Sequence, residues 1–208
     1  MKDIYDLRSI VNAESFPWKE IPIGIAKSGK QAGVFYGHYD TDLDLSHEQQ
    51  VWYKSVATSG PLSALIILLT SAKSWHDAWY KLEIEEHWTP TSNIINFPLL
   101  QSWLKENNIF KQMGRQIVFL QLQNANSPRH IDADLNDAPE EYRKNSEFIW
   151  ITSETNGKKL FVNNTEAPNI TWFNSYKEHY TLPESGVRWS LRIDGLFTEE
   201  FKEKLKQL

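Results

Sequence analysis

The sequence predicts an α+β protein in which a mainly helical first half packs against an all-β second half. Two observations support this prediction. Segments with helical periodicity and capping residues dominate residues 1–113, and short β-rich segments separated by polar turns dominate residues 114–197. Strands at this spacing, without helices between them, favour a sandwich or a barrel over alternating βαβ units. The 208 residues contain no linker-like segment, so we expect a single domain over residues 1–208.

The first half is expected to support the β-rich half with helices. A short N-terminal hairpin is predicted from "IPIGIA" and "AGVFYG", which are joined by the turn "KSGKQ". Helices follow this hairpin. Ser46 and Gln49 form a capping box for the first of them, Gly60 ends it, and Pro61 begins the second. The predicted helices cover residues 47–58, 61–72, 75–86 and 98–108.

The second half is expected to be built from strands. Alternating and β-branched segments recur between polar turns such as "SETNGK". An amphipathic helix over residues 198–208 closes the chain. The predicted strands are "RQIVFLQLQ", "EFIWIT", "KKLFV", "ITWF" and "GVRWSLRIDG".

The composition excludes several classes of function. A formal charge of -5 argues against a nucleic-acid partner, which would favour a basic face. The absence of cysteine excludes disulfides, thiolate metal sites and cysteine nucleophiles. The N-terminal "MKDIYDLRSI" lacks the apolar core of a signal peptide, and the apolar run "LSALIILL" is too short to span a bilayer. We therefore expect a soluble, cytoplasmic protein that binds neither nucleic acid nor membrane.

Two similar acidic strings are candidate metal sites. "GHYDTDLDL" contains His38 and Asp40, and "RHIDADLND" contains His130 and Asp132. On an extended chain, residues i and i+2 project to the same side, so either pair could grip one ion. Two imidazoles and one carboxylate on one face suit Fe(II) and leave its other positions open. Each string therefore needs one further histidine, and either could instead be an ordinary acidic loop.

The residues around the third ligand separate the two strings. His87 and His179 lie equally far downstream of their respective strings, so spacing alone does not choose between them. After His179, however, Arg188, Ser190 and Arg192 alternate along one predicted strand and share a face. A buried guanidinium is costly without an anion, and a planar carboxylate suits a bidentate arginine. The sequence therefore favours the string that contains His130 and Asp132.

The ordered set His130, Asp132, His179 and Arg188 in R-x-S resembles the Fe(II)/2-oxoglutarate-dependent dioxygenases. The ending "RWSLRID" is similar to the aspartyl/asparaginyl β-hydroxylase-like branch of that superfamily. The resemblance covers roughly residues 114–197. It implies a double-stranded β-helix, which is a jelly-roll or cupin-like core, with the helical first half as an N-terminal extension.

The same resemblance implies roles for individual residues. His130, Asp132 and His179 would bind Fe(II), and Arg188 with Ser190 would bind 2-oxoglutarate as the co-substrate. With O2, such an enzyme hydroxylates a C–H bond and releases succinate and CO2. The bias towards arginine near the site favours a small-molecule or peptide substrate that carries a carboxylate. Further substrate contacts are predicted, with other interpretations open, for Arg192, Arg143, Asn124 and Trp172.

Several alternatives remain open from the residues alone. His130 and Asp132 could form a surface loop, Arg188 could make a structural ion pair, and Arg192 could pair with acids near Asp194. The whole chain could be a cupin-like metalloenzyme that does not use 2-oxoglutarate. It could also be a non-catalytic jelly-roll module that binds sugars through its tryptophans. The sequence leaves the substrate and the oligomeric state undetermined.

Overall fold

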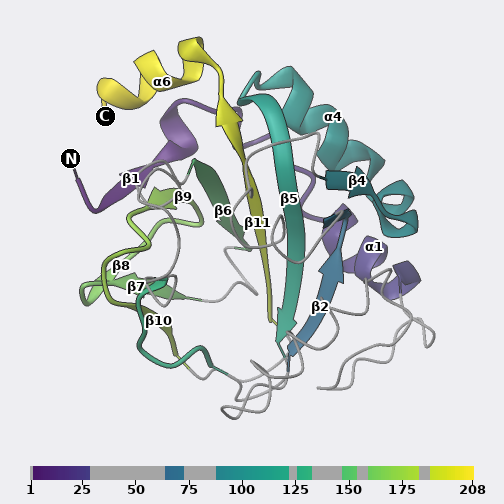
Figure 1. The fold of residues 1–208 in the computed structure, drawn as a ribbon, viewed down its shortest axis with the longest axis horizontal. Helices are drawn as coiled ribbons and strands as arrows, with labels where there is room; N and C mark the ends of the chain where they lie inside the picture. The colour runs from purple at the N-terminus through teal and green to yellow at the C-terminus, as the bar shows by residue number, and fades with distance from the viewer. Residues whose placement is uncertain are drawn as a thin grey trace.

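The structure, a computed structural model, describes residues 2–28, 64–72, 88–121, 126–132, 147–153, 159–182 and 188–208. Within these ranges the chain is a mixture of helices and strands (Figure 1). The helices are η1 Leu7–Ser9, α1 Glu20–Ser28, η3 Ser92–Asn96, α4 Pro98–Glu106 and α6 Glu199–Lys206. The strands are β1 Ile4–Asp6, β2 Ala64–Leu68, β3 Thr70–Ala72, β4 Trp88–Pro90, β5 Phe110–Gln121, β6 Phe148–Thr152, β7 Leu160–Val162, β8 Thr165–Glu166, β9 Ile170–Phe173, β10 His179–Thr181 and β11 Arg188–Phe197.

The strands of the described residues pair in an antiparallel manner throughout. A large sheet has the strand order β1-β9-β6-β11-β5-β2, and a small sheet has the order β10-β7-β8. Strands β3 and β4 form a separate pair. Strand β11 lies between β5 and β6, with Arg192 opposite Ile117 on one side and Trp150 on the other.

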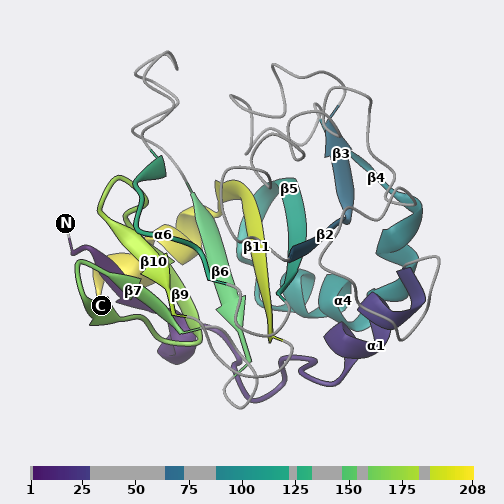
Figure 2. The same ribbon diagram turned by 90° about the horizontal axis from the view of Figure 1, so that it is seen from below.

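The two faces of the large sheet pack against different layers. One face joins the main apolar core, to which α1, α4 and α6 contribute Ile25, Leu100 and Phe201. The other face forms a second apolar cluster with the small sheet, composed of Phe148, Leu160, Val162 and Phe173. In both ribbon views the small sheet lies on the opposite side of the molecule from α1 and α4 (Figures 1 and 2).

Strand β11 sends apolar and polar residues to these two different faces, as its alternation predicts. Trp189, Leu191 and Ile193 belong to the main apolar core. Ser190, Arg192 and Asp194 are equally buried but face the second layer. The pairing with β5 is irregular between Ile193 and Gly195, and a Cβ at Gly195 would lie 2.3 Å from the carbonyl oxygen of Gln112. A glycine is therefore needed at this close approach, immediately after Asp194.

Residues 61–72 were predicted to form a helix, and this prediction is wrong for the described part of the segment. Ala64–Leu68 is strand β2, at the edge of the large sheet beside β5, and Thr70–Ala72 is strand β3. The neighbouring Ile67 and Leu68 are both buried, so both faces of the strand are covered. A continuous apolar run fits a strand buried on both faces as well as it fits a buried helix, and periodicity does not distinguish the two.

The prediction of a strand at "IPIGIA" is also wrong, because these residues lie in α1. Ile21 and Ile25 are buried, whereas Ile23 is 56% exposed. A strand would place the three isoleucines on one face, but a helix brings only residues four apart together. Gly24 permits the packing, since a Cβ there would lie 2.5 Å from the ring of Phe97. The other predicted hairpin strand, in "AGVFYG", lies outside the described residues.

The remaining predicted elements agree with the structure or lie outside its described part. The helix at 98–108 is confirmed as α4, and the C-terminal helix as α6. The strands of the second half are confirmed as β5, β6, β7, β9 and β11. The described part of the first half also contributes strands, since β1 and β2 belong to the large sheet. The helices predicted at 47–58 and 75–86 fall outside the described residues.

Across the described ranges, none of the helices combines the length and the apolar character that crossing a membrane requires.

Candidate metal centre

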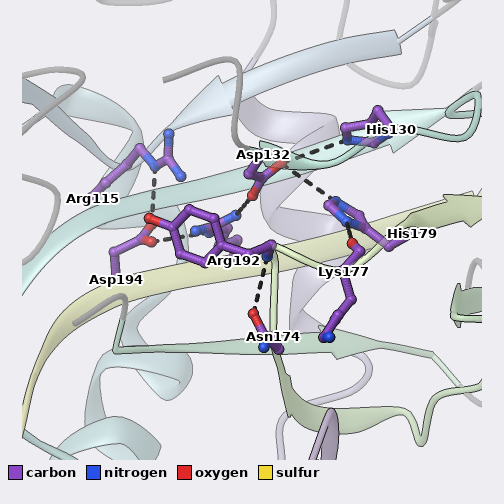
Figure 3. A network of polar contacts seen from close by, with 9 residues as sticks. Arg115, His130, Asp132, Asn174, Lys177, His179, Arg192 and Asp194 are labelled. Carbon is purple, nitrogen blue, oxygen red and sulfur yellow. Dashed lines mark hydrogen bonds and ion pairs between the residues drawn. The ribbon is translucent and has the colours of Figure 1, made fainter. Parts of the chain in front are cut away.

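Three of the predicted ligands meet between the large and the small sheet. His130 and Asp132 lie in the segment after β5, and His179 is the first residue of β10. The Nε2 atoms of His130 and His179 lie 3.6 and 3.4 Å from Oδ1 of Asp132. One ligand atom from each residue fits within 4.8 Å of the others, which brings the three side chains close enough to share one metal ion (Figure 3).

The backbone fixes the segment that carries His130 against β10. The amide of His130 donates to the carbonyl of His179 at 3.1 Å, and the amide of His179 donates back at 2.8 Å. Two residues further on, the amide of Asp132 donates to the carbonyl of Ser175 at 2.9 Å. This exchange is the hydrogen-bonded pair of an antiparallel ladder, so the two histidines are held directly opposite each other. Their ring centroids lie 4.2 Å apart.

Both imidazoles are oriented by main-chain carbonyl groups. Nδ1 of His130 lies 2.7 Å from the carbonyl oxygen of Pro128, and Nδ1 of His179 lies 2.9 Å from that of Lys177. A carbonyl oxygen only accepts hydrogen bonds, so each Nδ1 carries a proton and donates it. In the neutral ring the lone pair is then on Nε2, the atom that faces Asp132. This is the outer hydrogen-bonding arrangement that orients histidine ligands in metal sites.

The second oxygen of Asp132 contacts a chain of buried charges. Nη1 of Arg192 lies 3.2 Å from Oδ2 of Asp132, and Nε of Arg192 lies 3.0 Å from Oδ1 of Asp194. Nε of Arg115 lies 2.9 Å from Oδ2 of Asp194. Positive and negative groups therefore alternate from Arg115 to the triad of His130, Asp132 and His179 (Figure 3). The guanidinium of Arg192 also lies 4.0 Å above the ring of Phe148.

These contacts favour the charged form of both partners. Burial by itself would raise the pKa of Asp132, but its contact with His179 and the charge of Arg192 hold that pKa below its ordinary value. Burial would likewise lower the pKa of Arg192, but Asp194 and Asp132 raise it. The carboxylate is therefore ionised, as a metal ligand must be.

The predicted co-substrate strand presents buried polar groups on the same face. Arg188 and Ser190 precede Arg192 at alternate positions of β11, and Ser190 is fully buried. Trp150 on β6 pairs with Arg192, so its side chain lies on this face too. Neither Oγ of Ser190 nor Nε1 of Trp150, both buried, has a hydrogen-bond partner among the described residues. Two buried donors of this kind point to an acceptor that the described residues do not supply.

The other predicted substrate residues are placed only in part. Trp172, on β9, packs against Tyr5 and Phe148, with ring centroids at 5.5 and 6.3 Å. Its neighbour Phe173, on the opposite face of β9, contacts the ring of His179 at 5.1 Å. Any contact between Trp172 and a substrate stays a prediction. Asn124, Arg143 and the rival pair His38 and Asp40 lie outside the described residues.

The sequence assigned no role to Arg115 and left an ion pair of Arg192 near Asp194 only as one alternative, although Asp194 and Arg115 both belong to the site. The alternation in "RWSLRIDG" places Asp194 on the same face as Arg192, and this signal could have identified the pair. Arg115 carries no comparable signal, because only the pairing of β5 with β11 brings it to Asp194. The carbonyl groups of Pro128 and Lys177 are equally invisible in the sequence, since any residue type supplies a carbonyl.

Comparisons with known proteins add weak likenesses. No protein-family model matches the sequence, and neither does any curated protein. Several solved structures are similar to the chain, among them one oxidoreductase and two prolyl hydroxylases. One is an oxidoreductase of the 2OG-Fe(II) oxygenase family from Burkholderia pseudomallei, at 11% identity and a TM-score of 0.37, covering 72% of this chain and 78% of that chain.

Two further similar structures are prolyl hydroxylases. The viral collagen prolyl hydroxylase of Paramecium bursaria Chlorella virus-1, in its 2OG complex, shares 12% identity at a TM-score of 0.35 and covers 52% of this chain and 78% of its own. The prolyl hydroxylase from Trichoplax adhaerens, in complex with a hypoxia-inducible-factor peptide, shares 12% identity at a TM-score of 0.36. The match covers 76% of this chain and 80% of that chain. Likenesses of this degree assign neither a fold nor a family, so the geometry of the site carries the functional proposal.

Proposed function

We propose that the chain is an Fe(II)/2-oxoglutarate-dependent oxygenase that hydroxylates a C–H bond of an amino acid, a peptide or another carboxylate-bearing substrate. The observation that carries the proposal is the cluster of His130, Asp132 and His179, with both Nε2 atoms turned to one carboxylate oxygen. We further propose that the strands around it form a double-stranded β-helix of the aspartyl/asparaginyl β-hydroxylase-like branch, on the sequence resemblance stated above.

The chemistry of the donor set fits Fe(II). Two neutral imidazoles and one carboxylate are the ligands of non-heme Fe(II) oxygenases, which leave the opposite positions of the metal open. The proton on each Nδ1 is already engaged by a main-chain carbonyl, so no ring must turn or change tautomer to bind the ion. Asp132 is held in its charged form by the surrounding groups. The metal would thus enter an arrangement that the apoprotein already has.

The neighbouring strand face fits an anionic co-substrate. Arg188 supplies a guanidinium at the start of β11, and Ser190 supplies a buried hydroxyl two residues later. A carboxylate would accept hydrogen bonds from both, and it would give the Ser190 hydroxyl the partner it lacks among the described residues. The buried indole N–H of Trp150 is a further donor on this face.

The roles of the residues follow from these positions. Iron(II) with 2-oxoglutarate and O2 would supply the oxidising chemistry that inserts oxygen into a C–H bond and releases succinate and CO2. His130, Asp132 and His179 would hold the metal on one side. Arg188 and Ser190 would orient the co-substrate through its remote carboxylate. The aromatic residues Phe148 and Phe173, packed beside the site, would limit the access of water.

The most direct test combines binding with turnover. Fe(II) and 2-oxoglutarate added together without oxygen should produce a weak visible charge-transfer band, which His179→Ala should abolish. A screen of amino acids and peptides in air should then reveal substrate-dependent formation of succinate. If the protein binds neither iron nor 2-oxoglutarate, and His179→Ala changes neither measurement, the proposed function is wrong.

Replacing Arg188 separates this function from that of a cupin-like enzyme with the same metal ligands. Arg188→Ala should raise the KM for 2-oxoglutarate by roughly 10–100-fold, because it removes a charged hydrogen-bonding partner of the co-substrate. Fe(II) affinity in the absence of 2-oxoglutarate should stay unchanged. Arg8→Ala, which removes an exposed arginine paired with Asp6, is the control. A metal-dependent activity that needs no 2-oxoglutarate and is unchanged in Arg188→Ala would favour the cupin-like alternative.

A further inference from the structure

We propose that Arg192 is a positioning residue for the metal ligand Asp132, which it restricts to binding through one oxygen. This inference rests on the proposed metal site. The two oxygens of Asp132 have different partners. Oδ1 faces Nε2 of both histidines, whereas Oδ2 lies 3.2 Å from Nη1 of Arg192. With Oδ2 engaged by a cation, Oδ1 is the oxygen that remains for the ion.

Arg192 is itself fixed by two groups besides Asp132. Its side chain is 11% exposed, and its Nε lies 3.0 Å from Oδ1 of Asp194. Its guanidinium lies over the ring of Phe148, which covers one side of the planar group. The rigid fork of arginine allows Nε to bind Asp194 while Nη1 binds Asp132. The contact with Asp132 therefore comes from a group that has little freedom to turn away.

Asp194 is fixed in turn by a second arginine. Its Oδ2 lies 2.9 Å from Nε of Arg115, whose side chain is 12% exposed. Arg115, Asp194, Arg192 and Asp132 alternate in sign, so each of these four charges has an opposite neighbour. The glycine at 195, which the close approach of Gln112 requires, sets the backbone immediately beyond Asp194. Strands β5 and β11 therefore fix the position of the Arg192 side chain, and this side chain in turn fixes the orientation of the Asp132 carboxylate.

Single-oxygen binding has a consequence for the proposed reaction. A carboxylate that binds through both oxygens would take one more position on the metal. In an oxygenase those positions are needed by the co-substrate and by O2. Arg192 would therefore help to keep the metal open, in addition to orienting one ligand. Removing a hydrogen-bond partner of this kind from a metal ligand typically costs roughly 10–100-fold in metal affinity.

The test uses the full-length chain, stripped of metal with a chelator, and three variants. Arg192→Met removes the charge and the hydrogen bonds but keeps a long side chain. Arg192→Lys keeps the charge but has no planar fork to serve two carboxylates at once. Asp194→Asn leaves Arg192 in place and weakens its fixation. Arg8→Met is the matched control, since it removes an arginine and its ion pair on the exposed surface.

Two readouts follow the metal itself and do not depend on turnover. Anaerobic titration with Co(II) gives an apparent Kd, and the visible d–d spectrum of bound Co(II) reports its coordination number. Arg192→Met should weaken binding by roughly 10–100-fold and change the spectrum. Arg192→Lys and Asp194→Asn should show smaller changes in the same direction, and Arg8→Met should show none. Circular dichroism without metal shows which variants are folded.

The outcomes separate this inference from the proposed function. If the wild type binds Co(II) and the folded Arg192 variants match its Kd and spectrum, the inference is wrong and the proposed function stands. If Arg192→Met does not fold, wild-type values in Arg192→Lys overturn the inference by themselves. If the wild type binds Co(II) but never forms succinate, the function fails and the positioning role survives. If the wild type binds neither Co(II) nor Fe(II), both are wrong.

Discussion

At the scale of single residues, the two imidazoles of the triad have the same outer partner and very different surroundings. Each donates from Nδ1 to a carbonyl two residues earlier in the chain. The side chain of His179 is only 7% exposed and contacts the ring of Phe173, whereas that of His130 is 40% exposed. His179 therefore contributes to the core between the sheets, and His130 contributes mainly its ligand atom.

This difference predicts unequal effects on stability. In the metal-free protein, His179→Ala should lower the free energy of unfolding by about 1–2 kcal/mol, because it removes a buried ring and leaves the carbonyl of Lys177 without its donor. His130→Ala should cost no more than about 0.5 kcal/mol. Urea unfolding in the presence of a chelator measures both values. Equal losses of stability would contradict the assigned roles.

Metal binding should not show this inequality. Both substitutions remove a ligand, so each should weaken metal affinity by more than the roughly 10–100-fold that the loss of an outer hydrogen-bond partner costs. Titration with Co(II) or Fe(II) measures the two affinities. A variant of either histidine that retains wild-type affinity would exclude that residue from the metal site.

At the scale of elements, helix α4 depends on a residue far away in the sequence. Its start is signalled by Pro98, but its N-cap, Phe97, makes no side-chain capping bond. Instead, the carboxylate of Glu20 accepts the amides of Leu99 and Leu100 at 2.7 and 2.6 Å. The first residue of α1 thus caps α4 and joins two of the helices that pack on one face of the large sheet.

The contribution of this cap to the stability of the protein can be measured. Glu20→Ala should lower the free energy of unfolding by about 1–2 kcal/mol, since it leaves two helix N–H groups without a partner and removes a negative charge from a helix N-terminus. Glu20→Gln should lose less, because its amide oxygen still accepts one bond. Urea denaturation provides the measurement. Glu203→Ala, which breaks an exposed ion pair with Lys206 on α6, is the control and should stay within about 0.5 kcal/mol of the wild type.

The elements also show where sequence patterns fail. The apolar run at 64–68 is compatible with a helix and with a strand that is buried on both faces. Its pairing with β5 makes it a strand. The alternating isoleucines at 21, 23 and 25 suggest a strand, but packing against Phe97 selects the helix. In both segments the local preference is weak, so tertiary contacts determine the outcome.

At the scale of the whole molecule, the triad lies on the small-sheet side of the junction between the two sheets, and Arg192 of the large sheet contacts it. His130 and Asp132 follow β5 of the large sheet, and His179 belongs to β10 of the small sheet. Among the described residues, the segment 126–132 is further linked to β10 through Ser127, whose amide donates to Oγ1 of Thr181 at 2.8 Å. A bound metal would add a further link at this junction, so binding should stabilise the whole fold.

Thermal unfolding tests this expectation. At a Mn(II) concentration 100-fold above its Kd, the gain should be about 2.7 kcal/mol, because the ion binds the folded state alone. In a chain of this size that corresponds to a rise in Tm of roughly 5–10 °C. A chelator should reverse the rise, and His179→Ala should show none. A metal-dependent rise that persists in His179→Ala would place the ion elsewhere.

The sequence by itself determined which residues could form the site and much of the β-rich half. Ligand chemistry offered two candidate sets, and the alternation of Arg188, Ser190 and Arg192 after His179 favoured His130, Asp132 and His179, since both are local properties of the chain. Only the tertiary structure decided that β1 and β2 belong to the large sheet, that Glu20 caps α4, and that Arg115 and Asp194 fix Arg192 beside Asp132. These features depend on strand pairing and packing between residues far apart in the sequence, and such contacts leave no periodic signal in either segment alone.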